Sequence, residues 1–344
     1  MTEFTIQIIL PIIRVFRHDK YPVEIIKKAI NDLSYSVKQI RINNHYFSDL
    51  QVSLRKYSTV PKKFMNTPKG IMHFSDETVF LFTCKSLIDY NLVAEQVKKE
   101  GFEEVPFGSL MKFTKDLVKF ETIKLLKKEL DEVFILSHVS TPGALKFRDG
   151  AIFIDNKFYE EFESLSGFIR EAFEHCNLVK YPKIEYVSSK RLSANIKRLN
   201  VDFNVEPKNQ LEKALNCLSN VLNPRLDINE ILMYSVIGLE TLFVNGEQNI
   251  QKQIDEKVQL LLGKLSSHKR IIKNLYNFRS KLFHGEIELK PFHYYRNELI
   301  NDIDDIDLKL YEACAFSTLI LVATIQKMIL TGRKELVFKT ELKN

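Results

Sequence analysis

The pattern of apolar residues changes once along this chain of 344 residues, at Pro207. Before Pro207, short runs rich in β-branched and aromatic residues alternate with stretches of helical periodicity; after it, the strand signals stop. We therefore expect an α+β fold. Residues 1–204 are predicted to form a mixed α/β module, and residues 205–344 an all-α helical bundle.

The first module is predicted to alternate strands with helices. The runs typical of strands are residues 4–9, 51–57, 78–83, 133–136 and 151–154. The stretches with helical periodicity are residues 23–39, 87–100, 110–130 and 157–175. Its sequence contains no glycine-rich phosphate loop and no nucleophile motif. Its role therefore stays open between sensing, regulation and substrate selection.

The second module is predicted to contain helices only, at residues 208–222, 228–244, 248–262, 264–284 and 304–330. Asp227 and Ser267 are the expected N-caps, and Gly285 is the expected glycine after a helix end. The uncharged apolar run 313–325 is shorter than the roughly 20 residues of a membrane span, so we expect a buried helix and no membrane contact. The four cysteines form no ligand spacing, which is typical of free thiols in a cytoplasmic protein.

The helix predicted at residues 264–284 has the most informative charge pattern. Residues 257–285 contain no Asp or Glu but seven cations, Lys257, Lys264, Lys269, Arg270, Lys273, Arg279 and Lys281. Although the whole chain carries only +6, this local concentration is typical of a polyanion site.

The helical periodicity of this segment separates an apolar stripe from a polar face. The expected stripe is Ile271, Leu275, Phe278 and Leu282, and the polar face holds Lys269, Lys273, Asn277, Ser280 and His284. Arg279 is expected on the flank, about 140° around the helix from His284. One copy therefore does not bring Arg279 and His284 together, whereas two facing copies could close a site around a phosphate.

The string LYNFRSKLFHG at residues 275–285 resembles the signature of HEPN domains, in which an Arg and a polar residue precede a His on one helix. Its wording is most similar to the Apea-like HEPN subgroup, which tends to carry a Gly/Ala-Leu-Glu-x-Leu segment on an earlier helix. Residues 238–242 match that segment, with Glu240 as the acidic residue. The resemblance covers roughly residues 205–330.

The resemblance implies a dimeric, metal-independent endoribonuclease, a type of enzyme common among toxins and effectors of prokaryotic antiviral defence, including abortive infection. It implies neither a metal nor a cofactor. Arg279 and His284 would be catalytic, with Ser280 orienting His284 or touching phosphate. RNA contacts and support would come from Lys273, Asn277, Lys281 and Glu240, of which Glu240 would hold Arg279 or another cation.

Two other readings of the second module stay open. It could bind nucleic acid or a nucleotide without cutting while the first module docks a partner, or it could be a toxin silenced by an antitoxin. Two further basic clusters are either RNA-tracking surfaces or solvated faces: residues 180–198, and the set Arg55, Lys56, Lys62, Lys63 and Lys69. The acidic stretch 301–307 lacks the Gly and distal Glu of a Ca²⁺ loop, and His175-Cys176 lacks partner ligands.

Overall fold

The computed structural model describes residues 2–13, 23–38, 49–56, 66–67, 70–71, 78–88, 90–99, 106–147, 149–163, 165, 168–203, 206–264, 271–286 and 305–338. Contacts divide the chain into two compact units. Unit 1 comprises Met1–Arg17, Asn31–Phe134 and Lys146–Ser164, and unit 2 comprises His18–Ile30, Ile135–Leu145 and Leu165–Asn344. The predicted division at residues 204/205 thus differs from the observed one, because residues 165–203 belong to the second unit.

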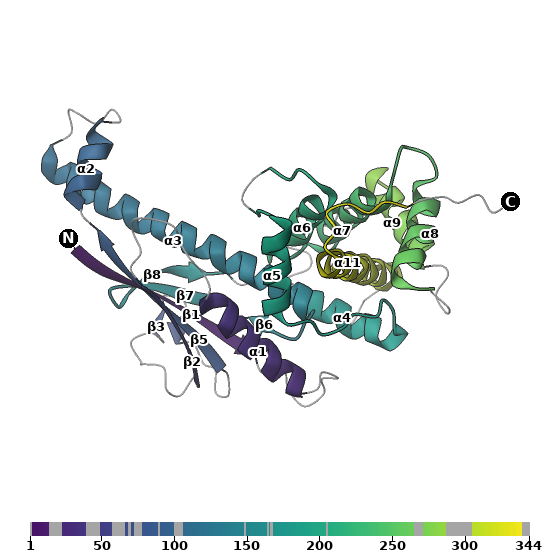
Figure 1. Ribbon diagram of the computed structural model, residues 1–344, viewed down its shortest axis with the longest axis horizontal. Coiled ribbons are helices and arrows are strands. Elements are labelled where there is room, and N and C mark those ends of the chain that lie inside the picture. Colours follow the sequence, from purple (N-terminus) through teal and green to yellow (C-terminus); the bar gives the residue numbers. More distant parts are fainter. Residues whose placement is uncertain are drawn as a thin grey trace. The chain divides into compact units, whose positions relative to one another are not determined.

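Unit 1 contains an antiparallel sheet with the strand order β2-β5-β1-β7-β8, in which β6 also pairs with β1 (Figure 1). Its strands are β1 (Thr2–Ile13), β2 (Asp49–Lys56), β5 (Thr78–Ile88), β6 (Lys146–Phe147), β7 (Gly150–Ile154) and β8 (Lys157–Phe162). A separate pair is formed by β3 (Asn66–Thr67) and β4 (Gly70–Ile71). β1 suits the central position because Phe4, Ile6, Ile8 and Leu10, which alternate along it, are all buried.

Three helices accompany the sheet: α1 (Val23–Lys38), α2 (Tyr90–Lys99) and α3 (Phe107–Ser140). Unit 1 takes α3 as far as Phe134, whose ring packs edge-on against Phe162 of β8 with centroids 6.4 Å apart. The last turns of α3 and the start of α1 are counted with unit 2. Helix and antiparallel sheet together confirm the α+β class.

Two predicted elements of the first module are wrong. Residues 133–136 are not a strand but the continuation of α3, because a short buried apolar run has the same appearance in a strand and in a helix. Residues 157–175 are not one helix, since β8 is followed by α4 (Phe168–Val179). A hairpin at Asp155 and Asn156, both with positive φ, joins β7 to β8 with Ile154 paired to Lys157.

In the described residues of unit 2, all regular secondary structure is helical, and loops join the helices. After α4 come α5 (Ser189–Leu199), α6 (Gln210–Val221), α7 (Ile228–Phe243), α8 (Ile250–Leu262), α9 (Ile271–Phe283) and α11 (Asp305–Thr331). The five helices predicted after Pro207 are confirmed, with ends that differ by a few residues except at the start of α9. The predicted N-cap Ser267 and residues 265–270 lie outside the described residues.

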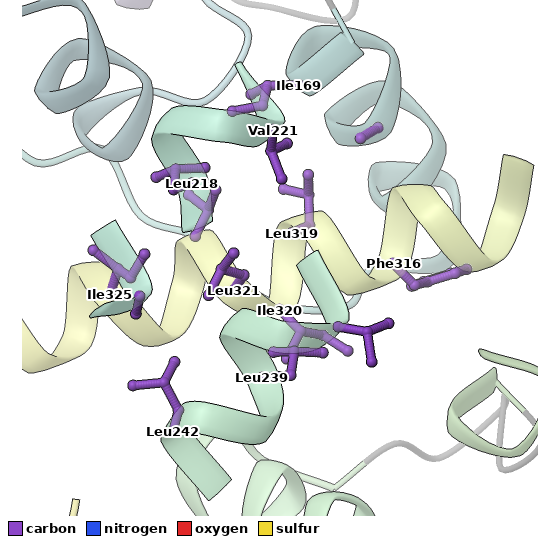
Figure 2. Close-up of a cluster of buried hydrophobic side chains, with 14 of the residues drawn as sticks. Ile169, Leu218, Val221, Leu239, Leu242, Phe316, Leu319, Ile320, Leu321 and Ile325 are labelled. Carbon is purple, nitrogen blue, oxygen red and sulfur yellow. The ribbon is translucent and has the colours of Figure 1, made fainter. Parts of the chain in front are cut away.

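α11 is the central helix of unit 2 and contacts α4, α5, α6, α7, α8 and α9. Figure 2 shows Leu239 and Leu242 of α7 on one side of α11, and Leu218 and Val221 of α6 on the other. The segment Leu308–Thr331 is long and apolar enough to cross a membrane, but 89% of its most apolar window is buried. Burial on all sides accounts for that composition in the core helix of a bundle.

The ends of the helices follow the local sequence. The Asp227 carboxylate accepts hydrogen bonds from the N–H groups of Asn229 and Glu230, and the Glu230 side chain accepts one from the Asp227 N–H. This capping box confirms the predicted start of α7. Cys176, Cys217 and Cys314 are free, as expected.

Candidate functional site

α9 places most of the predicted site residues on one exposed face. Lys273, Asn277, Ser280, Lys281 and His284 are all exposed, so the predicted polar face exists. The buried side is formed by Ile272, Leu275, Tyr276 and Leu282.

Arg279 was expected on the flank of α9, but it does not lie there. At 100° per residue, it falls in the middle of the side that holds Ile272, Leu275, Tyr276 and Leu282. The expected position was measured from a stripe of Ile271, Leu275, Phe278 and Leu282, but Ile271 and Phe278 are only partly buried. Ile272 and Tyr276 are buried instead, which moves the centre of the buried side toward Arg279. Arg279 is tolerated there because α7 supplies a partner for it.

That partner is Glu240 of α7. Its Oε1 lies 3.2 Å from Nη2 of Arg279, and the side chains retain only 22% and 33% of their accessible surface. The hydroxyl of Tyr276 donates a 3.2 Å hydrogen bond to the same carboxylate oxygen. Burial and the adjacent Glu240 carboxylate raise the pKa of Tyr276, while Arg279 opposes this shift, so the hydroxyl keeps its proton. Tyr276 was not among the predicted site residues; its signal is a Tyr one turn before the Arg on the same helix.

Gly238 lies two residues before Glu240, where α7 packs closely against its neighbours. A Cβ added at Gly238 would lie 2.9 Å from Cδ1 of Leu321 and 3.2 Å from Cβ of Cys217. The missing side chain therefore lets α7 approach α11 and α6 closely. Gly238 and Glu240 are two residues apart, so the close approach and the ion pair belong to the same turn of α7.

His284 lies directly after the last residue of α9, where the backbone forms a Schellman motif. The Glu286 N–H donates to the Lys281 carbonyl at 2.8 Å, the Gly285 N–H donates to the Leu282 carbonyl at 3.3 Å, and Gly285 has φ +69°. Gly285 thus has its predicted role. The His284 N–H donates to the Ser280 carbonyl, but the described hydrogen bonds include none between the Ser280 hydroxyl and the imidazole.

The seven cations of residues 257–285 divide into different roles. Lys257 donates hydrogen bonds to the carbonyl of Phe243, the last residue of α7, at 2.6 Å, and to Oε1 of Gln253 at 2.9 Å. Lys257 therefore caps a helix, and Arg279 is held by Glu240. Lys264, Lys273 and Lys281 are exposed, whereas Lys269 and Arg270 lie outside the described residues. Among the described cations of this segment, three therefore remain exposed to solvent, one just before α9 and two on it.

The described residues contain no group of three or more His, Cys, Asp and Glu side chains placed to hold a metal. His175 Nε2 lies 4.0 Å from a Glu312 oxygen and packs edge-on against Phe316. Burial raises the pKa of the Cys176 thiol, which opposes formation of a thiolate ligand. Residues 301–304 of the acidic stretch, and most of the cluster that begins at Arg55, lie outside the described residues.

The arrangement offers a guanidinium paired with a carboxylate that Tyr276 also contacts, and an exposed imidazole at the end of the same helix. The chain matches no family model, no curated protein and no solved structure significantly. Two features of the chain itself therefore point to a function: the residue pattern at 275–285 and the contact of Arg279 with Glu240.

Proposed function

We propose that the protein is a metal-independent endoribonuclease of HEPN type. The observation that carries the proposal is the half-buried Glu240–Arg279 ion pair, reinforced by Tyr276, on the helix that ends at an exposed His284. A surface ion pair gains little stability. An Arg held by a carboxylate that is itself hydrogen-bonded by Tyr276 is, however, positioned for charge stabilisation of a reacting phosphate.

The chemistry would use the 2′-OH of the RNA as the nucleophile. His284 takes the 2′-OH proton as the 2′-oxygen bonds to phosphorus, and Arg279 stabilises the charge that develops on the phosphorane oxygens. The bond from phosphorus to the 5′-oxygen then breaks, and that oxygen takes the proton from the His284 imidazolium. The products are a 2′,3′-cyclic phosphate and a 5′-OH, so no metal-activated water is needed.

The site would be completed by a second copy of the chain. Arg279 points toward α7, whereas His284 leaves α9 about 140° away on the exposed face. Lys273, Asn277, Ser280 and Lys281 share that face and would contact the RNA. A cytoplasmic antiviral effector or toxin, controlled by unit 1, an antitoxin or a sensor protein, is the corresponding biological role.

The test is incubation of the full chain with RNA in EDTA, followed by analysis of the product ends. We expect cleavage that leaves cyclic phosphate ends and is lost in Arg279→Ala and His284→Ala. Arg225→Ala, which changes an exposed arginine in the turn between α6 and α7, is the control and should cleave normally.

A non-catalytic RNA-binding module is the second candidate, and one observation favours it. Within one chain, Glu240 already occupies part of the Arg279 guanidinium, and Arg279 and His284 diverge. A folded protein that binds RNA but leaves every RNA intact in EDTA would establish this alternative.

A further inference from the structure

α5 carries the most one-sided charge distribution among the described helices of unit 2 outside α9. It has four cations, Lys190, Arg191, Lys197 and Arg198, and residues 186–201 contain no Asp or Glu. Ordinary surfaces mix both signs of charge. This cluster therefore needs a reason beyond solubility.

The four cations of α5 share one face of the helix. At 100° per residue they fall within an arc of about 120° centred near Ala194, and all five residues are exposed. Leu192 and Ile196 fall on the opposite side and are buried in the core of unit 2. Lys190 and Lys197, like Arg191 and Arg198, are two turns or about 10 Å apart. This face therefore carries four cations around one small central side chain, that of Ala194.

Helix capping accounts for only half of these charges. Lys197 and Arg198 are in the last turn of α5, where cations complement the helix dipole. Lys190 and Arg191 are in the first turn, directly after the N-cap Ser188, where the same dipole disfavours cations. The helix dipole therefore does not account for Lys190 and Arg191.

The C-terminal end of α11 extends the cationic face. A Cβ added at Gly332 would lie 3.1 Å from Nη2 of Arg198, so this guanidinium lies over Gly332, next to the exposed Arg333. Nζ of Lys334 donates a 3.3 Å hydrogen bond to the Asn200 carbonyl, which fixes this loop at the end of α5. Two segments far apart in the sequence therefore contribute to one basic surface.

We propose that the exposed face of α5, together with Arg333, is a second RNA-binding surface, distinct from the Arg279 and His284 site, that contacts the phosphate backbone. A protein partner would need apolar anchors, and this face offers only Ala194 at its centre. An interfacial membrane helix would need its apolar side exposed, but Leu192 and Ile196 are buried. Exposed cations without apolar anchors fit a sugar-phosphate chain.

The test measures binding of labelled oligouridylate to the full chain in EDTA over a series of salt concentrations. All proteins carry His284→Ala, so that cleavage cannot interfere. We expect Lys190→Gln/Lys197→Gln and Arg191→Gln/Arg198→Gln each to weaken binding roughly 25-fold at about 0.1 M salt, and to reduce the salt slope by about 1.4, the value for two lost phosphate contacts. Arg333→Gln should act in the same direction with about half that slope change.

The matched control is Lys124→Gln/Lys128→Gln, which removes two exposed lysines from α3. Equal binding by the control and the α5 variants would overturn the proposal. So would loss of binding to anionic vesicles without loss of binding to RNA. Lys190→Gln/Arg191→Gln should raise the Tm slightly, because these cations oppose the helix dipole, so weaker RNA binding by this variant cannot come from unfolding. A wild-type chain that binds RNA through α5 without cutting it would refute the ribonuclease and leave this surface standing.

Discussion

Arg279 shows most clearly how one residue acquires its role from the fold. A cation in the middle of a buried helix face is unfavourable by itself. Glu240 of α7, which accepts a hydrogen bond from Tyr276, compensates for it. The ion pair suggested from the sequence is present. The direction of Arg279 could not be predicted, because it depends on a carboxylate that lies 39 residues earlier in the chain.

The Glu240–Arg279 interaction should be energetically coupled. In a double-mutant cycle of Glu240→Gln and Arg279→Gln, we expect a coupling energy of about 1 kcal/mol in urea unfolding. The control cycle uses the Lys252–Glu256 pair, which is 3.8 Å apart and 71% and 65% exposed, and should give a value near zero. Additive effects at Glu240 and Arg279 would contradict the fixed guanidinium.

His138, in the last turns of α3, should make stability depend on pH. Burial lowers its pKa from 6.5 to about 4, so the folded state binds fewer protons than the unfolded state between these values. Stability is then lost as pH falls through this range, by about 2 kcal/mol between pH 7 and pH 5.

The measurement is urea unfolding of the wild type and of His138→Gln at both pH values. Asp131 has the opposite sign, because burial raises its pKa from 3.8 to about 6, but it is present in both proteins and cancels. Equal pH dependence in the two proteins would show that His138 is not buried as a neutral imidazole.

At the scale of elements, helices with a strong period were predictable and elements that depend on long-range packing were not. The N-cap Asp227 and the glycine Gly285 set helix ends through local chemistry, and both were predicted from the sequence, whereas the Glu230 half of the capping box was not. β8 was missed because its half-exposed, charged residues resemble a helical surface, although Asp155 and Asn156 carried a hairpin signal.

Gly238 should be intolerant of any side chain. Gly238→Ala forces a Cβ against Leu321, which we expect to destabilise the protein by about 1 kcal/mol after the gain in helix propensity is included. It should also weaken RNA cleavage, since Glu240 moves with the same turn. Gly108→Ala in α3 is the control, because no atom lies within 4 Å of an added Cβ, and it should be neutral or stabilising. Equal stability of the two variants would refute close packing at Gly238.

On the scale of the whole molecule, the two units should respond separately to core mutations. Leu192 of α5 belongs to the core of unit 2, together with α11. Leu192→Ala should cost about 2–5 kcal/mol and lower hydrogen-exchange protection in α11, while the amides of β1 and β7 keep theirs. Loss of protection in β1 with none in α11 would instead place α5 with the sheet, as the predicted boundary at residues 204/205 implied.

The central claim, that this chain cuts RNA through Arg279 and His284 without a metal, is tested most directly at the substrate. The measurement compares two RNAs in EDTA, one unmodified and one with a single 2′-deoxy nucleotide at the mapped cleavage position. We predict equal binding of both RNAs and cleavage of the unmodified RNA alone, lost in His284→Ala. Cleavage of the 2′-deoxy substrate, or cleavage that EDTA abolishes, would contradict the account.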